Sequence, residues 1–99
     1  MSTSPVTRAV IIVNPHGLHA RPAERLARTA MKYKSRVEIL YRDERIDARS
    51  ILLLLTMGAT KGTELVIEAD GEDAEQAVDD LANLITSGFV EEHKPAKDP

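Results

Sequence analysis

Four segments of the chain carry the pattern of a half-buried β-strand. Residues 7–13 are rich in β-branched side chains, and residues 36–42 and 64–70 alternate between apolar and polar positions. A shorter strand at 45–48 is expected to pair with the second of these through a turn at 43–44. Alternation that leaves one face apolar is typical of an antiparallel sheet covered on one side only.

Two longer segments carry a helical period. Apolar side chains recur at spacings of three and four from residue 20 onward and again from residue 73 onward, which predicts two helices with one buried face each. The buried face of the first is expected to comprise Ala23, Leu26, Ala27, Ala30 and Met31. The buried face of the second is expected to comprise Ala74, Ala77, Val78, Leu81 and Ile85.

Capping residues mark where the second of these helices begins and ends. Asp73, followed three positions later by Gln76, predicts a capping box at its start. Gly88 is expected to end the helix in a Schellman motif, in which Phe89 packs back on Leu84.

A short apolar run at 51–57 is expected to form a third helix, because Ser50 is a favourable N-cap residue and Gly58 a favourable terminator. A helix this short cannot bury every face at a protein surface. We expect its core side to consist of Leu53, Leu54 and Met57, and its exposed side to consist of Ile51, Leu52 and Leu55. An exposed apolar patch is typical of a partner-binding surface. The pattern leaves a fully buried helix or a buried strand open as alternatives.

The elements follow the order strand, helix, strand, strand, helix, strand, helix (βαββαβα). This order predicts an α+β fold, an open-faced sandwich in which a four-stranded antiparallel sheet carries three helices on one face. Pattern alone does not separate it from other split β-α-β arrangements. The domain is expected to span residues 7–90, with a flexible start at 1–6 and a charged, disordered tail at 91–99.

Composition narrows the class of protein. The chain has 99 residues, enough for one domain with one core, and its 13 basic and 16 acidic residues give a net charge of −3. It lacks a basic stripe with interleaved aromatic residues, so nucleic acid is not an expected partner. The absence of cysteine excludes disulfides, thiolate metal sites and cysteine nucleophiles. Neither a signal peptide nor a membrane-spanning run is recognised, so we expect no membrane insertion and a cytoplasmic location.

The stretch most indicative of chemistry is Gly-Leu-His-Ala-Arg-Pro-Ala at 17–23, where the first helix begins. Pro22 suits the first turn of a helix, and the free N–H groups of that turn attract an anion. Arg21 adds a planar set of donors that matches phosphate oxygens. His19 supplies a neutral ring nitrogen that can act as a nucleophile. Together these residues predict a histidine that accepts a phosphoryl group.

A second stretch places Ser50 31 positions after His19, at the start of the short apolar helix. With this spacing the chain resembles HPr, the histidine-containing phosphocarrier of the bacterial phosphoenolpyruvate-dependent phosphotransferase system, and its nitrogen-branch relatives, over residues 7–89. The resemblance is carried by the His-Ala-Arg-Pro-Ala run, Ser50, Lys61-Gly62 and Ser87-Gly88-Phe89. It selects the family's sheet order and implies a stoichiometric carrier in sugar transport rather than a catalyst with a small-molecule pocket.

The resemblance also implies a role for each candidate site residue. His19 would take the phosphoryl group through Nδ1 from a phosphoenolpyruvate-protein phosphotransferase (enzyme I) and pass it to histidines of enzyme IIA-type permease components or regulators. Arg21 and the backbone N–H of Ala20 would stabilise that group. Ser50 would be the family's regulatory serine, the target of an HPr serine kinase/phosphorylase, besides its plain role as an N-cap. The expected partner-contact residues are Pro22, Ile51, Leu52 and Leu55.

Several alternatives stay open from sequence. A purely regulatory protein would have docking to carbon or nitrogen regulators as its output, whereas a small-ligand-binding α+β module would be expected to lack the His19–Arg21 pair. We interpret His16 as an exposed turn residue, although it could compete for the phosphoryl group or tune it. No cofactor is expected, and the spacing of His16, His19 and His93 suits no known metal site. The protein is expected to act as a monomer.

Overall fold

The computed structural model describes residues 4–90, and over these residues the chain forms four strands and three helices in the predicted order. The strands are β1 (Val6–Ile11), β2 (Arg36–Tyr41), β3 (Glu44–Asp47) and β4 (Glu64–Asp70). The helices are α1 (Ala20–Met31), α2 (Ile51–Thr56) and α3 (Ala74–Thr86). The expected tail at 91–99, with His93, lies outside the described residues, as do residues 1–3.

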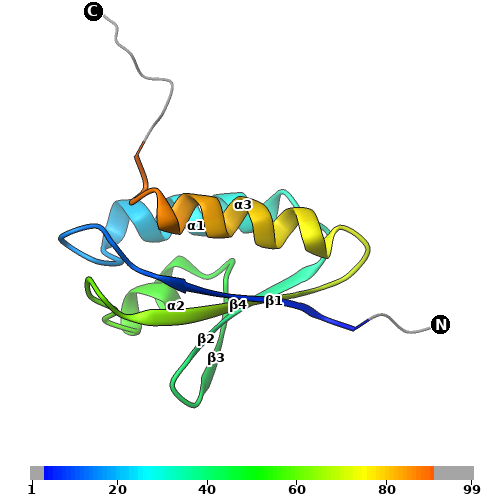
Figure 1. Ribbon diagram of the computed structural model, residues 1–99, viewed down its shortest axis with the longest axis horizontal. Helices are drawn as coiled ribbons and strands as arrows, with labels where there is room; N and C mark the ends of the chain where they lie inside the picture. Colours follow the sequence, from blue (N-terminus) through cyan, green and yellow to red (C-terminus); the bar gives the residue numbers. More distant parts are fainter. Residues whose placement is uncertain (1–3, 91–99) are drawn as a thin grey trace, which may run out of the picture.

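The strands form one antiparallel sheet in the order β1-β4-β2-β3. In Figure 1, α1 and α3 lie side by side on one face of this sheet, and α3 packs on β1 and β4. The short helix α2 lies against α1 and β3. The open-faced α+β sandwich predicted from the element order is therefore confirmed. Within residues 4–90 no helix has the length and apolar character needed to cross a membrane.

The inward side of the sheet and the facing helix stripes form the core. Alternate residues of β2 and β4 are fully buried, as are the stripes of α1 and α3, which confirms the predicted periodicity. The largest fully buried side chains include Leu26, Ile39, Leu65, Ile67, Leu81 and Ile85. Met31, predicted to be buried, is 57% exposed. It is the last residue of α1 and lies about 100° around the helix from Ala30, beyond the edge of the buried stripe.

The boundaries of β1, β2 and β3 differ from prediction by one or two residues. β1 begins at Val6, inside the segment predicted to be flexible, and ends at Ile11 rather than at residue 13. The chain stays attached beyond that point, because the N–H of Gly62 donates to the Ile12 carbonyl over 2.7 Å. β3 begins at Glu44, since the turn from β2 is made one residue earlier, with Arg42 at a φ of 57°.

The two ends of α3 have different outcomes. The predicted capping box is wrong, because Asp73 makes no side-chain capping bond and has a φ of −106° and a ψ of 27°, not the extended conformation of an N-cap. Its carboxylate instead accepts hydrogen bonds from the Ser35 hydroxyl and from the N–H groups of Lys34 and Ser35. These bonds, the hydroxyl bond first, lower the pKa of Asp73.

The C-terminal end of α3 has the hydrogen bonds of the predicted Schellman motif. The N–H of Gly88 donates to the Ile85 carbonyl over 3.1 Å, and the N–H of Phe89 donates to the Leu84 carbonyl over 3.0 Å. Phe89 is buried and has a φ of 62°. Because the chain turns back here, the end of α3 comes close to the start of α1.

Candidate functional site

The segment between β1 and α1 is held in place by Gly17. This residue has a φ of 67°, and a Cβ atom there would lie 2.4 Å from the Ala59 carbonyl oxygen, so only glycine fits without displacing backbone. The next residue, Leu18, is buried and donates its N–H to the same Ala59 carbonyl over 3.0 Å. Asn14 closes the turn, because its Nδ2 donates to the Gly17 carbonyl over 2.6 Å. The backbone that leads to His19 is therefore fixed.

His19 is the N-cap residue of α1. Its backbone is extended, with a φ of −90° and a ψ of −165°, and its carbonyl accepts the Ala23 N–H over 2.9 Å. The imidazole makes no capping bond to the first turn of α1 and is exposed. A free, exposed ring at a fixed backbone position can approach a group presented by another molecule.

The first turn of α1 adds features that favour an anion beside His19. Ala20 and Arg21 follow the N-cap, and the N–H groups of a first turn have no acceptor within the helix. The Arg21 side chain is exposed. Pro22 is also in the first turn, as predicted, but it is buried, so a partner can reach little of its surface. We therefore place Pro22 in the wall of the site rather than on the partner-contact surface.

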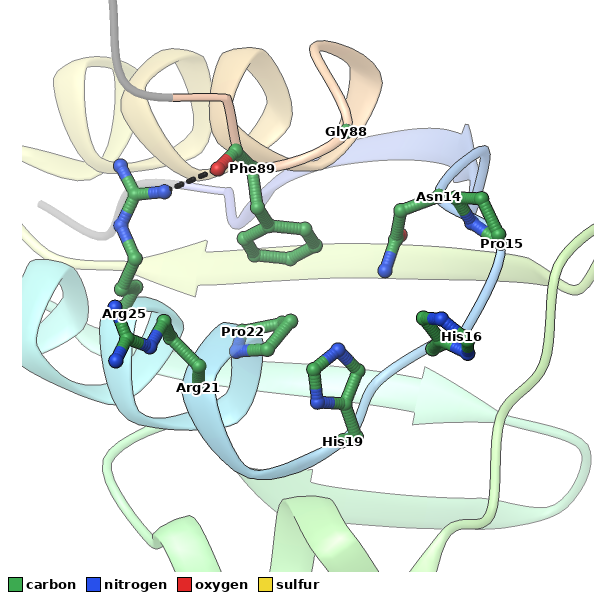
Figure 2. A pocket seen from close by; sticks show the side chains of 9 residues that line it. All are labelled: Asn14, Pro15, His16, His19, Arg21, Pro22, Arg25, Gly88 and Phe89. Carbon is green, nitrogen blue, oxygen red and sulfur yellow. Dashed lines mark hydrogen bonds between the residues drawn. The ribbon is translucent and has the colours of Figure 1, made fainter. Parts of the chain in front are cut away.

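A cavity of about 330 Å³ opens beside His19 (Figure 2). It is lined by Asn14, Pro15, His16, His19, Arg21, Pro22, Arg25, Gly88 and Phe89. Among these lining residues of the described chain, the charged side chains are Arg21 and Arg25, and none is acidic. The cavity therefore favours an anion of phosphoryl size.

Sequence reasoning missed Arg25 and Phe89 as parts of this site. Arg25 lies one helical turn after Arg21, and its guanidinium donates to the Phe89 carbonyl, a contact drawn in Figure 2. The spacing of four residues between the two arginines was a signal that they share a face of α1. No local pattern could have shown Phe89, because its place beside α1 depends on how α3 packs.

The imidazole ring of His16 lies close to that of His19. The two ring centroids are 5.8 Å apart, and the rings meet nearly edge to face at 88°. His16 is exposed, as interpreted from the sequence, yet it lines the same cavity. Figure 2 shows the ring of His19 with Arg21 and Pro22 on one side and His16 on the other.

The short helix α2 presents an apolar surface. Leu54 is 0% exposed and Met57 is 9% exposed, so these two residues face the core as predicted. Leu53, also predicted to face the core, is 46% exposed. It lies about 100° around the helix from Leu54, and in a helix of six residues only one narrow stripe contacts α1 and β3.

We call the exposed apolar side chains of this helix the α2 apolar surface; they are Ile51, Leu52, Leu53 and Leu55. The predicted exposure of Ile51, Leu52 and Leu55 is confirmed, and the alternatives of a buried helix or strand are wrong. Four exposed aliphatic side chains on one short helix form a patch that needs an explanation beyond folding.

Ser50 is the N-cap of α2, as predicted. Its backbone is extended, and its Oγ accepts the Leu53 N–H over 3.1 Å. The residue is half-buried at the edge of the α2 apolar surface. Ser50 therefore has a structural role as the N-cap of α2, and its phosphorylation is taken up under the proposed function.

Comparison with known proteins agrees with this geometry. The sequence model described as "PTS HPr component phosphorylation site" matches residues 6–87. The phosphocarrier protein HPr of Neisseria meningitidis serogroup A is 37% identical over 84 residues, which are 85% of this chain and 94% of that protein. The multiphosphoryl transfer protein of Haemophilus influenzae is 35% identical over 98 residues, which are 92% of this chain and 20% of that protein. The crystal structure of HPr-C-His from Thermoanaerobacter tengcongensis superposes with a TM-score of 0.80 at 36% identity, covering 91% of this chain and 99% of that one.

Proposed function

The chain belongs to the HPr family, the phosphocarriers of the phosphotransferase system, and we propose that His19 is the residue that carries its phosphoryl group. The observation that supports this most strongly is the position of the imidazole. It stands free at the N-cap of α1, on the wall of a cavity whose charged side chains are both arginines.

The reaction needs little covalent help from the protein. A ring nitrogen of His19 donates its lone pair to the phosphorus of a phosphorylated partner, the bond from phosphorus to the partner's leaving group breaks, and that group keeps the bonding electrons. Such transfers depend on positioning and on charge stabilisation. The guanidinium of Arg21 and the first-turn N–H groups of Ala20 and Arg21 receive the phosphoryl oxygens. The reverse arrangement passes the group to an acceptor.

The α2 apolar surface is proposed as the part that partners grip. A carrier must bind both a donor protein and an acceptor protein. Two partner proteins of different structure can bind the same apolar surface on the carrier. The proposed donor is a phosphoenolpyruvate-protein phosphotransferase (enzyme I), and the proposed acceptors are enzyme IIA-type components or regulators. Leu52, the most exposed residue of the surface at 72%, is the clearest candidate for a contact that contributes to binding rather than to folding.

The acceptor assignment is tested by phosphorylation with phosphoenolpyruvate and a catalytic amount of enzyme I, followed by mapping of the acid-labile phosphate. We expect one labelled site in the parent protein, no label in His19→Ala, and label that still maps to His19 in His16→Ala. Label that persists in His19→Ala, or that maps to His16, contradicts the assignment. Matching thermal melts of the two variants and the parent show that the fold is intact.

Ser50 supports a second, regulatory function. A phosphate there would sit at the N-terminal end of α2 and would add about −1.5 to −2 charges beside an apolar surface, which weakens contacts that depend on it. We expect an HPr serine kinase/phosphorylase with ATP to modify Ser50, and Ser50→Asp to accept phosphoryl groups more slowly than Ser50→Asn, which can keep the cap without the charge. An unmodified Ser50, together with equal rates for the two variants, leaves Ser50 as a cap only.

A further inference from the structure

The cavity beside His19 contains a second imidazole with no role in the reaction described so far. His16 and His19 are three residues apart, and their rings are brought to a centroid distance of 5.8 Å by the turn that Gly17 makes. That turn cannot relax easily, because Gly17 is pressed against the Ala59 carbonyl and Asn14 bonds across it. The fixed backbone therefore keeps the two imidazole side chains within reach of each other.

The charges around His16 decide what a proton on it would do. The titratable and charged side chains that line the cavity are His16, His19, Arg21 and Arg25, and no carboxylate among the described residues lines it. Lys61 belongs to the 58–63 segment packed behind the turn and does not line the cavity. In the free protein, a proton on His16 meets only positive or neutral neighbours. With a phosphoryl group on His19, the same proton meets an anion instead.

We propose, on the premise that His19 is the phosphoryl acceptor, that His16 is a proton-linked positioning residue that holds the phosphoryl group of phosphorylated His19. In its protonated form its ring N–H groups are donors for phosphoryl oxygens on the side of the cavity opposite Arg21. No bond of the phosphoryl group is made or broken by His16; it takes one proton from solvent and returns it.

Thermodynamic linkage makes the effect reciprocal. If a phosphoryl group on His19 favours the proton on His16 by some factor, the proton favours the phosphoryl group by the same factor. We expect a factor of at least about five, the lower end of typical couplings between sites. The carrier then holds its phosphoryl group more tightly in acid than in base, so its readiness to pass the group on depends on pH.

The test is the equilibrium between phosphoenolpyruvate and the carrier. The parent protein, His16→Asn and His16→Lys are each equilibrated with phosphoenolpyruvate, excess pyruvate and catalytic enzyme I between pH 5.5 and 8.5, and the phosphorylated fraction is measured. Dividing the equilibrium constant of the parent by that of His16→Asn cancels the pH dependence that comes from the small molecules and from the titratable groups that both proteins share. We expect this quotient to fall at least about fivefold from low to high pH. His16→Lys, with a permanent charge, should hold the group at high pH as the parent does at low pH.

A second measurement separates binding from mere packing. The Cε1–H signal of His16 is followed by NMR across the same pH range in the free and the phosphorylated protein. We expect its titration midpoint to move to higher pH on phosphorylation by the logarithm of the same factor. A quotient that is flat with pH, or an unmoved midpoint, overturns the role of His16 while phosphate still maps to His19. Phosphate that maps to His16, or that persists in His19→Ala, overturns the proposed function itself.

Discussion

Shortening Leu52 and Leu54 to alanine should separate partner docking from folding within one helix. Leu54 is 0% exposed and contacts the core, whereas Leu52 is 72% exposed. Truncating a fully buried leucine costs about 2–5 kcal/mol, because apolar burial is lost and a cavity remains. For a domain of this size, each kcal/mol lowers Tm by about 4–8 °C. A cost of about 3 kcal/mol for Leu54→Ala therefore corresponds to a Tm lower by about 12–24 °C.

Leu52→Ala should behave in the opposite way. An exposed side chain that supports nothing beneath it changes stability by about 0.5 kcal/mol or less. If Leu52 is a contact for enzyme I, losing about 1–2 kcal/mol of binding weakens the complex by a factor of about 5–30. Thermal melts measure the first effect, and the dependence of transfer rate on carrier concentration measures the second.

Two outcomes for Leu52→Ala would contradict this reasoning. If Leu52→Ala melts as early as Leu54→Ala, the assignment of inward and outward faces on α2 is wrong. If Leu52→Ala is stable and accepts phosphoryl groups at the parent's concentration dependence, the α2 apolar surface does not bind enzyme I. Leu53→Ala is a useful third variant, because the structure, unlike the sequence, places Leu53 outside the core.

Three further changes test other parts of the structure. Arg21→Glu should nearly abolish transfer without unfolding the protein, and Arg21→Lys should be intermediate because a point charge lacks the planar fork; equal rates for all three proteins remove Arg21 from the site. Gly17→Ala should be less stable in urea than Gly58→Ala, because both residues have positive φ but only Gly17 has a backbone atom within 4 Å of the added Cβ; equal losses contradict the steric argument. The pKa of Asp73 is lowered in the folded state, so the ionised carboxylate stabilises the fold fully above its unfolded pKa of about 3.9, and this stabilisation is lost as pH falls through the folded pKa. In urea melts, the free energy of unfolding of Asp73→Asn should therefore approach that of the parent at low pH. A difference between the two proteins that stays constant with pH contradicts this.

The sequence predicts this fold well because its signals are local and periodic. The alternation at 64–70 matches β4 (Glu64–Asp70), and the spacing of small apolar residues matches the start of α1. What periodicity does not give is the width of a buried stripe. Met31 and Leu53 are each next to a buried residue in the sequence but lie outside the buried stripe of their helix, and their exposure depends on which elements cover the helix. The order β1-β4-β2-β3 came from the family resemblance and not from the pattern.

Contacts between segments that are distant in the sequence explain the other differences from prediction. Asp73 has the residue type of a cap, but its carboxylate accepts hydrogen bonds from Ser35, the residue before β2, and rules for local sequence do not include such a distant partner. His19, Arg21 and Ser50 could be named from sequence because short motifs place them at helix starts. The contact between Arg25 and Phe89 could not be predicted, since 64 positions separate the two residues along the chain and only packing joins them.

The bond from Arg25 to the Phe89 carbonyl joins parts of the cavity that are synthesised at different times. A ribosome delivers β1 and the proposed nucleophile His19 early, but the far wall of the cavity, Gly88 and Phe89, arrives near the end of the described chain. Until those residues emerge, the cavity beside His19 lacks this wall. The complete cavity, and with it the proposed ability to hold a phosphoryl group, should therefore appear only when the residues that follow α3 have been synthesised.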